Sequence, residues 1–430
     1  STRKESSAAS DVYKRQPLYY AFISFLFTLE SIIYINDAGD QTSFAHMAQK
    51  FGFFEFAIYR YKTWSSRLLI ESVTMFMSNH YLLFDVTMLI SVAIFFYCFN
   101  GIFLKEEKYR KLQFVSPVIF LLSFPSLFFT SAGLIATVTN YLFPMISFVI
   151  AWYCMIQEKH WYTILSLPFL VFACMQEQFT VYAFILFIFA LISSYLERKR
   201  INKNYFIATC VSLLGLVSGL LCSGSTNRLA TETKIWYPGF ETISFPVKII
   251  KGYLETNRVL FVTSELNIVY LFLVLIIVVS IIKKQYFMTF ISGTVIYTVI
   301  TQRLAMNSLL TAVQRTIDNQ NKSEIPNYFS LKENLYPLIL YTLILCTIAT
   351  VVFLMFRKWQ NGLTALIILA AGYASRMTVS LSPTIYASGL RTYTPLILSF
   401  TIVSLLLLIE ISGDIKKDCG SDSIKHRMTI

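Results

Sequence analysis

The sequence is dominated by stretches of mainly apolar residues that alternate with short polar segments. A helix needs about 20 apolar residues to cross the ~30 Å hydrocarbon core of a bilayer. We therefore predict an all-α, polytopic membrane protein with about 12 transmembrane helices. The predicted spans are 17–35, 82–103, 113–131, 136–156, 161–175, 178–196, 205–222, 266–282, 286–302, 335–356, 361–379 and 393–411. The fifth is short and contains Pro168, which indicates a re-entrant or strongly tilted element.

The composition excludes a soluble protein. Of the 430 residues, 56% are hydrophobic and only 14% are charged, whereas soluble domains carry about 25% charged residues. The net charge is +12, but Lys and Arg occur in short runs between apolar stretches. A nucleic-acid partner is therefore not expected, and the excess indicates membrane topology. The seven cysteines lack CxxC spacing, which argues against a zinc site or a disulfide framework.

Basic residues predict the orientation of the chain. They concentrate in the short loops on the same side as the N-terminus, so both termini are expected in the cytoplasm of a bacterial cell, with the chain crossing the cytoplasmic membrane many times. Residues 1–16 look like a translated cloning linker and are expected to be disordered. We expect one transmembrane domain over 17–411 and a cytoplasmic tail over 412–430.

Three long segments fall on the predicted outer side, at 36–81, 223–265 and 303–334. Loops longer than about 12–15 residues are usually functional or disordered, and these are too aromatic for disorder. We therefore expect interfacial helices in them and a working surface that faces outward.

The first outer loop opens with Asn36-Asp37-Ala38-Gly39-Asp40. A carboxylate beside a low-dielectric wall can have a raised pKa and act as a general base. Asp37 or Asp40 could thus take a proton from an acceptor hydroxyl that attacks a sugar phosphate. The alternative is a solvated turn at the end of a helix.

Further along the loop, Trp64, Arg67 and Glu71 have i, i+3 and i+7 spacing. This spacing predicts one face of an amphipathic interfacial helix. Arg67 could hold a phosphate, and Trp64 could stack on a sugar ring. The alternative is an interface anchor with an Arg–Glu pair.

Smaller polar groups lie at other outer helix ends: Asn140 and Tyr141, Glu177, Asn227 and Arg228, and Arg391. Ser223–Arg228 resembles a small anion-binding corner. Each group alone is more often a capped helix end, and for Arg391 the alternative is a side chain that reaches the lipid headgroups. Together they place carboxylates, amides and arginines on one side of the membrane, as a donor with a phosphate leaving group requires.

These segments resemble the GT-C class of glycosyltransferases, in scattered short motifs from residue 17 to about 411. More narrowly, the chain is similar to an uncharacterised bacterial multi-spanning family related to the Gtr-type O-antigen glucosyltransferases. The segments that carry the resemblance are Asn36–Asp40, Trp64–Arg67, Asn140–Pro144, Glu177-Gln178, Ser225–Arg228 and Pro383–Arg391.

The resemblance implies a GT-C-like hexosyltransferase. It implies a polyprenyl-phosphate sugar donor and a glycan or lipid acceptor of the cell envelope on the outer face. Asp37 or Asp40 would be the base, and Arg67, Arg228 and Arg391 would hold the phosphate. Unlike an adjacent Asp-Asp pair, the two acidic residues here are separated by Ala38 and Gly39. Which Asp acts, and whether a divalent cation takes part, therefore stays open, although no histidine cluster indicates a metal.

Two other functions fit a polytopic chain. A polysaccharide or lipid transporter or flippase would show Gly- or Pro-interrupted helices, midplane charges and inverted repeats. With only 15 glycines and with charges mostly at helix ends, the chain favours an enzyme over a transporter. A polysaccharide polymerase or ligase, another enzyme type with large outer loops, is the second alternative.

Overall fold

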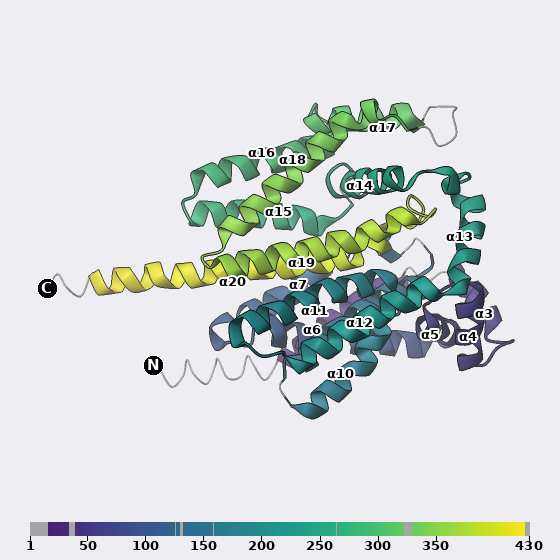
Figure 1. Cartoon of the computed structure of the whole chain (residues 1–430). Helices are drawn as coiled ribbons and strands as arrows, with labels where there is room; N and C mark the ends of the chain where they lie inside the picture. The colour runs from purple at the N-terminus through teal and green to yellow at the C-terminus, as the bar shows by residue number, and fades with distance from the viewer. Residues whose placement is uncertain are drawn as a thin grey trace. The chain divides into compact units, whose positions relative to one another are not determined.

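The computed structural model describes residues 16–33, 39–124, 126–129, 132–157, 159–263, 265–321 and 329–425. Over these residues the chain forms helices joined by turns, with no strand, which confirms the predicted all-α class. The chain divides into two compact units (Figure 1). Unit 1 comprises Ser1–Glu232 and Ala387–Pro395, and unit 2 comprises Thr233–Tyr386 and Leu396–Ile430. A short segment near the C-terminus thus belongs to the N-terminal unit.

Seven helices in the described part of the chain are long and apolar enough to cross a membrane. They are Tyr81–Phe103, Leu134–Met155, Glu177–Glu197, Lys203–Leu221, Leu331–Met355, Trp359–Leu381 and Leu390–Ser412. Each overlaps one of the predicted spans. The segment with Pro168 forms a helix of only 14 residues, His160–Ala173, which is ~21 Å long and too short to cross the hydrocarbon core upright.

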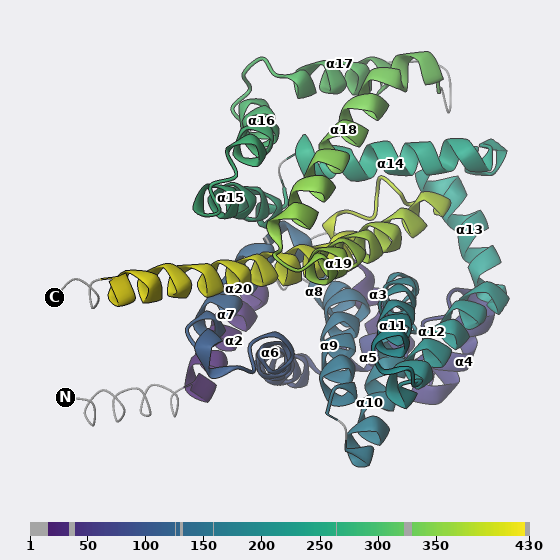
Figure 2. The ribbon, with the colours of Figure 1, turned by 60° about the vertical axis from the view of Figure 1, so that its left-hand side comes forward.

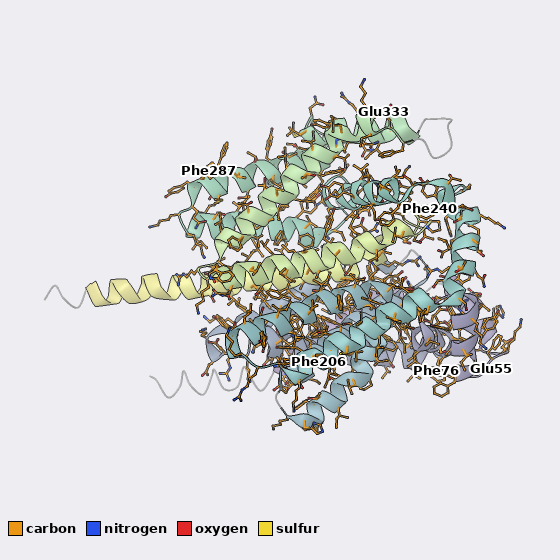
Figure 3. The ribbon with its side chains drawn as sticks, viewed as in Figure 1. Glu55, Phe76, Phe206, Phe240, Phe287 and Glu333 are labelled. Atoms are coloured by element: carbon orange, nitrogen blue, oxygen red, sulfur yellow. The ribbon has the colours of Figure 1, made fainter. Side chains whose placement is uncertain are left out.

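Unit 1 is built around one central helix, α9 (Phe143–Met155), which packs on α6 (Tyr81–Phe103), α10 (His160–Ala173) and α11 (Glu177–Arg198) (Figure 2). In the span that contains α9, 94% of the residues are buried, against 11% in the span of α12 (Lys203–Leu221). The α12 helix exposes apolar side chains such as Phe206 (Figure 3). Exposed apolar side chains on such a helix are expected to face lipid, because water would penalise them.

Aromatic packing joins the first helices of unit 1. The helices α2 (Gln16–Ile33) and α7 (Leu112–Ser123) pack on each other and on α6. Phe120 of α7 lies 4.9 Å from Phe95 and 5.2 Å from Phe27, measured between ring centroids. These tilted and edge-on arrangements are those that aromatic rings prefer.

The first predicted outer loop is helical. It contains α3 (Asp40–Met47), α4 (Phe53–Thr63) and α5 (Leu68–Met77), which lie together at one end of unit 1 (Figure 1). The second contains α13 (Ser223–Trp236), η4 (Phe240–Thr242) and α14 (Phe245–Phe261), and the third contains α17 (Leu309–Asn321). The helices predicted in these loops are therefore present, and their location at a membrane surface stays a prediction.

Short helices complete unit 1. They are η1 (Glu107–Tyr109), η2 (Ser126–Phe129), α8 (Leu134–Thr137), the π-helical turn η3 (Val138–Leu142) and η6 (Leu390–Tyr393). The last of these packs on η2 and so ties the returning segment to unit 1.

In unit 2, neighbouring helices along the chain pack as pairs, α15 (Asn267–Ile282) with α16 (Tyr286–Arg303) and α18 (Leu331–Met355) with α19 (Trp359–Met377). The helix α19 leads into η5 (Thr378–Leu381), and the last helix, α20 (Thr394–Lys425), belongs to unit 2 from Leu396. An ion pair of 3.0 Å joins Lys283 Nζ to Glu410 Oε1.

Replacing Phe120 by Ala should destabilise unit 1, because the ring is buried among four other phenylalanines. We expect a loss of about 3 kcal/mol in the free energy of unfolding, measured by thermal denaturation in detergent. The control is Phe25→Ala on α2, whose side chain is 50% exposed. Equal losses in the two variants would contradict this account of the packing.

Candidate functional site

Nine polar residues of unit 1 form what we call the arginine cluster. Each contacts another member directly or interacts with it electrostatically. They are Asp40, Arg60, Arg67, Glu71, Asn140, Tyr141, Glu177, Arg228 and Arg391. Eight of these residues were predicted from the sequence as site residues, so the predicted convergence on one region occurs in the fold.

Tyr141 lies at the centre of the cluster. The guanidinium carbon of Arg67 lies 5.6 Å from the centroid of its ring, and that of Arg391 lies 5.8 Å from it. Both distances are within the range of cation–π attraction. One aromatic ring thus holds together two cations that are 324 residues apart in the chain.

Arg67 is fixed by a carboxylate and an amide. Its Nη2 lies 2.7 Å from Glu177 Oε2, its Nε donates to the same oxygen at 2.9 Å, and its Nη1 donates to Asn140 Oδ1 at 3.3 Å. Burial opposes the charge on Arg67, but the attraction of Glu177 outweighs it and raises the pKa of the guanidinium. Arg67 is therefore held as a cation in a set position.

Glu177 is presented by the start of α11. The side chain of Gln176 caps this helix, since its Oε1 accepts a hydrogen bond of 2.8 Å from Phe179 N. The segment at Gln176 and Glu177 is thus a capped helix end, which was the alternative interpretation from the sequence. It also provides Glu177 as the ion-pair partner of Arg67. A carboxylate in the first helical turn is favoured by the helix dipole.

Asn140 and Tyr141 lie on the π-helical turn η3. Pro144 follows, and it has no N–H to donate to the carbonyl of Asn140, which favours local rearrangement of the helix. The Asn140 Nδ2 group donates to Ala136 O at 2.9 Å and to Thr74 Oγ1 at 3.2 Å. These bonds leave Asn140 Oδ1 directed at Arg67. The sequence did not predict this π-helical turn, a feature that is frequent at functional sites.

Asp40 is positioned by a close approach of two backbone segments. Its N–H donates to Ala132 O at 3.1 Å. The preceding Gly39 has φ +85°, and a Cβ there would lie 2.8 Å from the Ala132 carbonyl, so only glycine fits. Water reaches the Asp40 side chain, yet surrounding protein removes part of its hydration. This burial raises the pKa of Asp40, although the charges of Arg391 and Arg60 act in the opposite direction.

Arg60 and Glu71 form a second ion pair, which also includes a hydrogen bond from Ser65 Oγ to Glu71. The Arg60 guanidinium also lies 5.2 Å from the centroid of a Trp64 ring. The sequence analysis missed Arg60, because it pairs with a residue 11 positions away across a turn and no helical period connects the two.

The predicted helix over Trp64–Glu71 is wrong. The helix α4 ends at Thr63, and α5 begins at Leu68, so Trp64 and Arg67 lie in the turn between two helices. Ser65 and Ser66 are buried there. The i, i+3 and i+7 spacing therefore does not define a helix face, and Trp64 packs on Arg60, with no contact to the rest of the cluster among the described interactions.

The segment Ser223–Arg228, predicted as a small anion-binding corner, forms the start of α13. Its binding of an anion stays a prediction. A Cβ on Gly224 would lie 2.2 Å from Trp64 N, so glycine allows α13 to approach the turn after α4 closely. Arg228 then reaches the cluster and pairs with Glu232 at 2.9 Å. Burial and Arg67 lower the pKa of Arg228, but Glu232 and Glu177 raise it more. Asn227 is exposed and does not join the cluster.

Arg391 differs from the other arginines of the cluster. Its segment, η6, is tied to α11 by a hydrogen bond of 2.6 Å from Gln178 Nε2 to Thr392 O. The guanidinium has no ion-pair partner among the described residues, and its buried Nε has no hydrogen-bond partner. A cation in this state is available to an anionic ligand.

Asn36 and Asp37 lie outside the described residues, so their predicted roles are not decided by the structure. Within the described ranges, no three His, Cys, Asp or Glu side chains gather in a way that could hold a metal ion.

No protein-family model, curated protein or solved structure matches the chain.

The raised pKa of Asp40 predicts a stabilising substitution. Because the folded protein favours the protonated form, ionisation of Asp40 opposes folding at pH values above its raised pKa. This penalty is absent below the ordinary pKa of Asp, about 3.9. Asp40→Asn should therefore raise the unfolding temperature at neutral pH, and the gain should vanish near pH 4. A loss of stability that is the same at all pH values would indicate a structural role instead.

Proposed function

We propose that this chain is a GT-C-type glycosyltransferase that moves a sugar from a polyprenyl-phosphate donor to a glycan or lipid acceptor. The observation that carries the proposal is the influence of Arg391 on the partly dehydrated carboxyl of Asp40: the charge of the guanidinium acts on this carboxyl, and within the described part of the chain the guanidinium has no ion-pair partner. General-base catalysis with a phosphate leaving group needs both groups.

Each residue has one role in the proposed transfer of the sugar. Asp40 accepts the proton of the acceptor hydroxyl as its oxygen bonds to the anomeric carbon of the sugar. The bond between that carbon and the phosphate oxygen breaks, and the electron pair leaves with the polyprenyl phosphate. Arg391 and Arg67 stabilise the negative charge on this leaving group, and Arg228 adds to the positive potential.

The charge of the cluster supports a phosphate ligand. Arg67 is bound to Glu177, Arg60 to Glu71 and Arg228 to Glu232, which leaves Arg391 as the cation without a counter-ion among the described residues. Phosphate oxygens accept hydrogen bonds from guanidinium groups in strong bidentate geometry. These residue roles require no divalent cation.

The membrane arrangement is part of the proposal. About 12 spans and cytoplasmic termini would place α3, α4 and α5 on the outer side of a bacterial membrane, together with the arginine cluster. The shorter apolar helices Leu112–Ser123, His160–Ala173 and Asn267–Ile282 would lie in the membrane beside the seven longer ones as strongly tilted or re-entrant elements.

Replacing Asp40 by Asn should abolish transfer, because the amide cannot accept the proton. A loss of about 10²–10⁴-fold is expected. The assay follows radiolabel from a polyprenyl-phosphate hexose into cell-envelope glycan, using protein reconstituted in vesicles. Asp37→Asn is tested in parallel. If both single variants retain full transfer, the base assignment is wrong. If label crosses the bilayer on intact donor without transfer, the chain is a transporter.

Replacing Arg391 by Ala should weaken donor binding without unfolding the protein. Loss of one charged hydrogen-bonding group costs about 2 kcal/mol, or roughly 30-fold in affinity. Binding of polyprenyl phosphate is measured by titration, and Arg391→Lys should recover part of it. Asn227→Ala, an exposed change beside Arg228, is the control. Failure of Arg391→Ala to enter the membrane would instead mark this residue as a topology anchor.

A further inference from the structure

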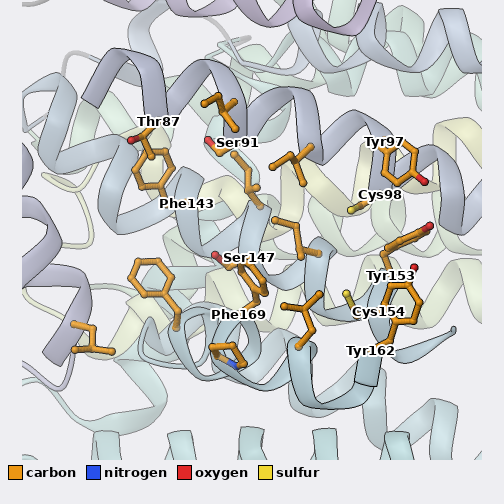
Figure 4. A pocket seen from close by; sticks show the side chains of 18 residues that line it. Thr87, Ser91, Tyr97, Cys98, Phe143, Ser147, Tyr153, Cys154, Tyr162 and Phe169 are labelled. Carbon is orange, nitrogen blue, oxygen red and sulfur yellow. The ribbon is translucent and has the colours of Figure 1, made fainter. Parts of the chain in front are cut away.

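An open apolar groove of about 820 Å³ lies along α6, α9 and α10 of unit 1 (Figure 4). We call it the α9 groove. Its walls are mainly aliphatic and aromatic, and none of the described residues that line it is charged. Tyr97, Tyr153 and Tyr162 lie at one end, opposite the end at which Thr87 lies (Figure 4). The groove can therefore hold a hydrocarbon chain, but it offers no partner to a charged headgroup.

A second groove, of about 510 Å³, lies between α2 and α6. We call it the α2 groove. Pro17 of α2 and Leu89 and Ala93 of α6 are among its apolar residues. Near the C-terminal end of α6 the groove is polar, and the residues that line it there are Tyr20, Asn100, Lys105 and Gln113. This groove thus joins an apolar wall to a polar end.

The two grooves run side by side along α6. Ile90, Ile94 and Tyr97 line both of them, and their i, i+4 and i+7 spacing places them on one ridge of the helix. On one side of this ridge, Thr87, Ser91 and Cys98 line the α9 groove alone, and on the other side Leu89, Ala93 and Asn100 line the α2 groove alone. The ridge thus separates two parallel grooves.

Each groove has the length of one acyl chain. The α6 helix rises by ~17 Å from Thr87 to Cys98 in the α9 groove and from Leu89 to Asn100 in the α2 groove. One leaflet of the hydrocarbon core is ~15 Å thick. Two parallel grooves of this length match a lipid with two acyl chains.

The polar end of the α2 groove has hydrogen-bond donors to spare. The Tyr20 hydroxyl oxygen accepts from Asn100 Nδ2 and from Gln16 Nε2, so its own hydrogen is left without an acceptor among the described residues. Gln113 Nε2 donates one hydrogen to Leu104 O at 2.8 Å, and its second has no acceptor in the described part of the chain. These groups suit a ligand rich in acceptor oxygens, such as a phosphate ester.

The charge at this end favours an anion. Lys108 pairs with Glu106 at 2.5 Å and Arg110 pairs with Glu107 at 2.8 Å, whereas Lys105 has no ion-pair partner within the described ranges. No acidic side chain lines the α2 groove, so an ammonium headgroup would find no carboxylate there. Basic pockets beside membrane helices are typical sites for anionic lipid headgroups.

This polar end lies far from the arginine cluster. Phe84, in the first turn of α6, packs on Phe143 at 6.4 Å between ring centroids, and Phe143 is two residues after Tyr141 of the cluster. From Phe84 to Asn100, α6 rises by ~24 Å. In the predicted orientation, the polar end therefore faces the cytoplasmic leaflet.

We propose that unit 1 binds one anionic phospholipid with two acyl chains at this end of α6. The phosphate lies at Lys105 and the Tyr20 hydroxyl, and the two chains lie in the α9 groove and the α2 groove, on either side of the ridge. This lipid is distinct from the substrates of the proposed sugar transfer, and its binding does not depend on that reaction.

The test places the protein in nanodiscs of equal parts phosphatidylglycerol and phosphatidylcholine, and native mass spectrometry identifies the lipid that stays bound. We expect one phosphatidylglycerol per chain, retained about fivefold over phosphatidylcholine. Lysophosphatidylglycerol, which has one acyl chain, should bind on the order of tenfold more weakly, because it leaves one groove empty. Excess inorganic phosphate should displace neither lipid, because it lacks the chains.

Lys105→Ala should remove the preference for phosphatidylglycerol over phosphatidylcholine, and Lys105→Arg should keep it. The matched control is Lys111→Ala, which removes the same charge from an exposed residue that lines neither groove. It should leave the preference unchanged.

Ala93→Trp fills the α2 groove and should make phosphatidylglycerol and its lyso form bind alike. Ala93→Leu is the smaller replacement if tryptophan prevents folding, which thermal denaturation in detergent detects. The control is Val86→Trp on the same helix, which is 46% exposed and lines neither groove.

Four outcomes would overturn the proposal. Equal retention of the two phospholipids would remove the anionic headgroup, and equal binding of the one-chain and two-chain forms would remove the paired grooves. An equal effect of Lys105→Ala and Lys111→Ala would indicate a diffuse surface charge. Displacement by inorganic phosphate would indicate a site for a free anion. Each of these results leaves the proposed sugar transfer untouched, since that reaction is assayed separately.

Discussion

The arrangement of the site depends on the ion pair between Arg67 and Glu177. It joins the turn before α5 to the start of α11, and through Asn140 it also joins the π-helical turn before α9. The Arg67 side chain is only 12% exposed, so removal of Glu177 would leave a poorly hydrated charge, which is far more costly than the loss of a surface pair. This pair therefore fixes three elements relative to one another before any ligand binds.

Around this fixed pair, the protein keeps two groups in states that do not favour its own stability. Asp40 loses hydration while it remains accessible to water, and Arg391 is held on Tyr141 without a counter-ion among the described residues. In the proposed reaction, the ligand would stabilise both states, because it would bring a hydroxyl to the carboxylate and a phosphate to the guanidinium. The nearby cations Arg60, Arg67 and Arg228 are each paired with a carboxylate. In the proposed reaction they contribute to the electrostatic potential of the site and fix its geometry, while Arg391 binds the phosphate.

The same helices connect the polar and apolar parts of the proposed site. Within five residues of Arg67, Tyr141 and Glu177, the same elements supply Leu69, Phe143 and Phe172, which line an open apolar groove along α6, α9 and α10. A lipid phosphate has this division of chemistry, with a charged end and a long hydrocarbon end. Glycine at positions 39, 101 and 224 makes the arrangement possible, since a Cβ at each would meet a neighbouring segment or ring.

The sequence by itself determined the helical class, the positions of the apolar helices and most members of the arginine cluster, because membrane helices are read from local hydropathy and ionisable residues at their ends are conspicuous. It misjudged the helix over Trp64–Glu71, since helical periodicity does not reveal where a turn interrupts a helix. Only the tertiary structure decided which charges pair. Arg60 pairs with Glu71, and Arg67 pairs with Glu177, whereas Arg391 lies on Tyr141 without an ion-pair partner among the described residues. These contacts depend on distances between segments that are up to hundreds of residues apart. Packing sets those distances, and no local pattern encodes them.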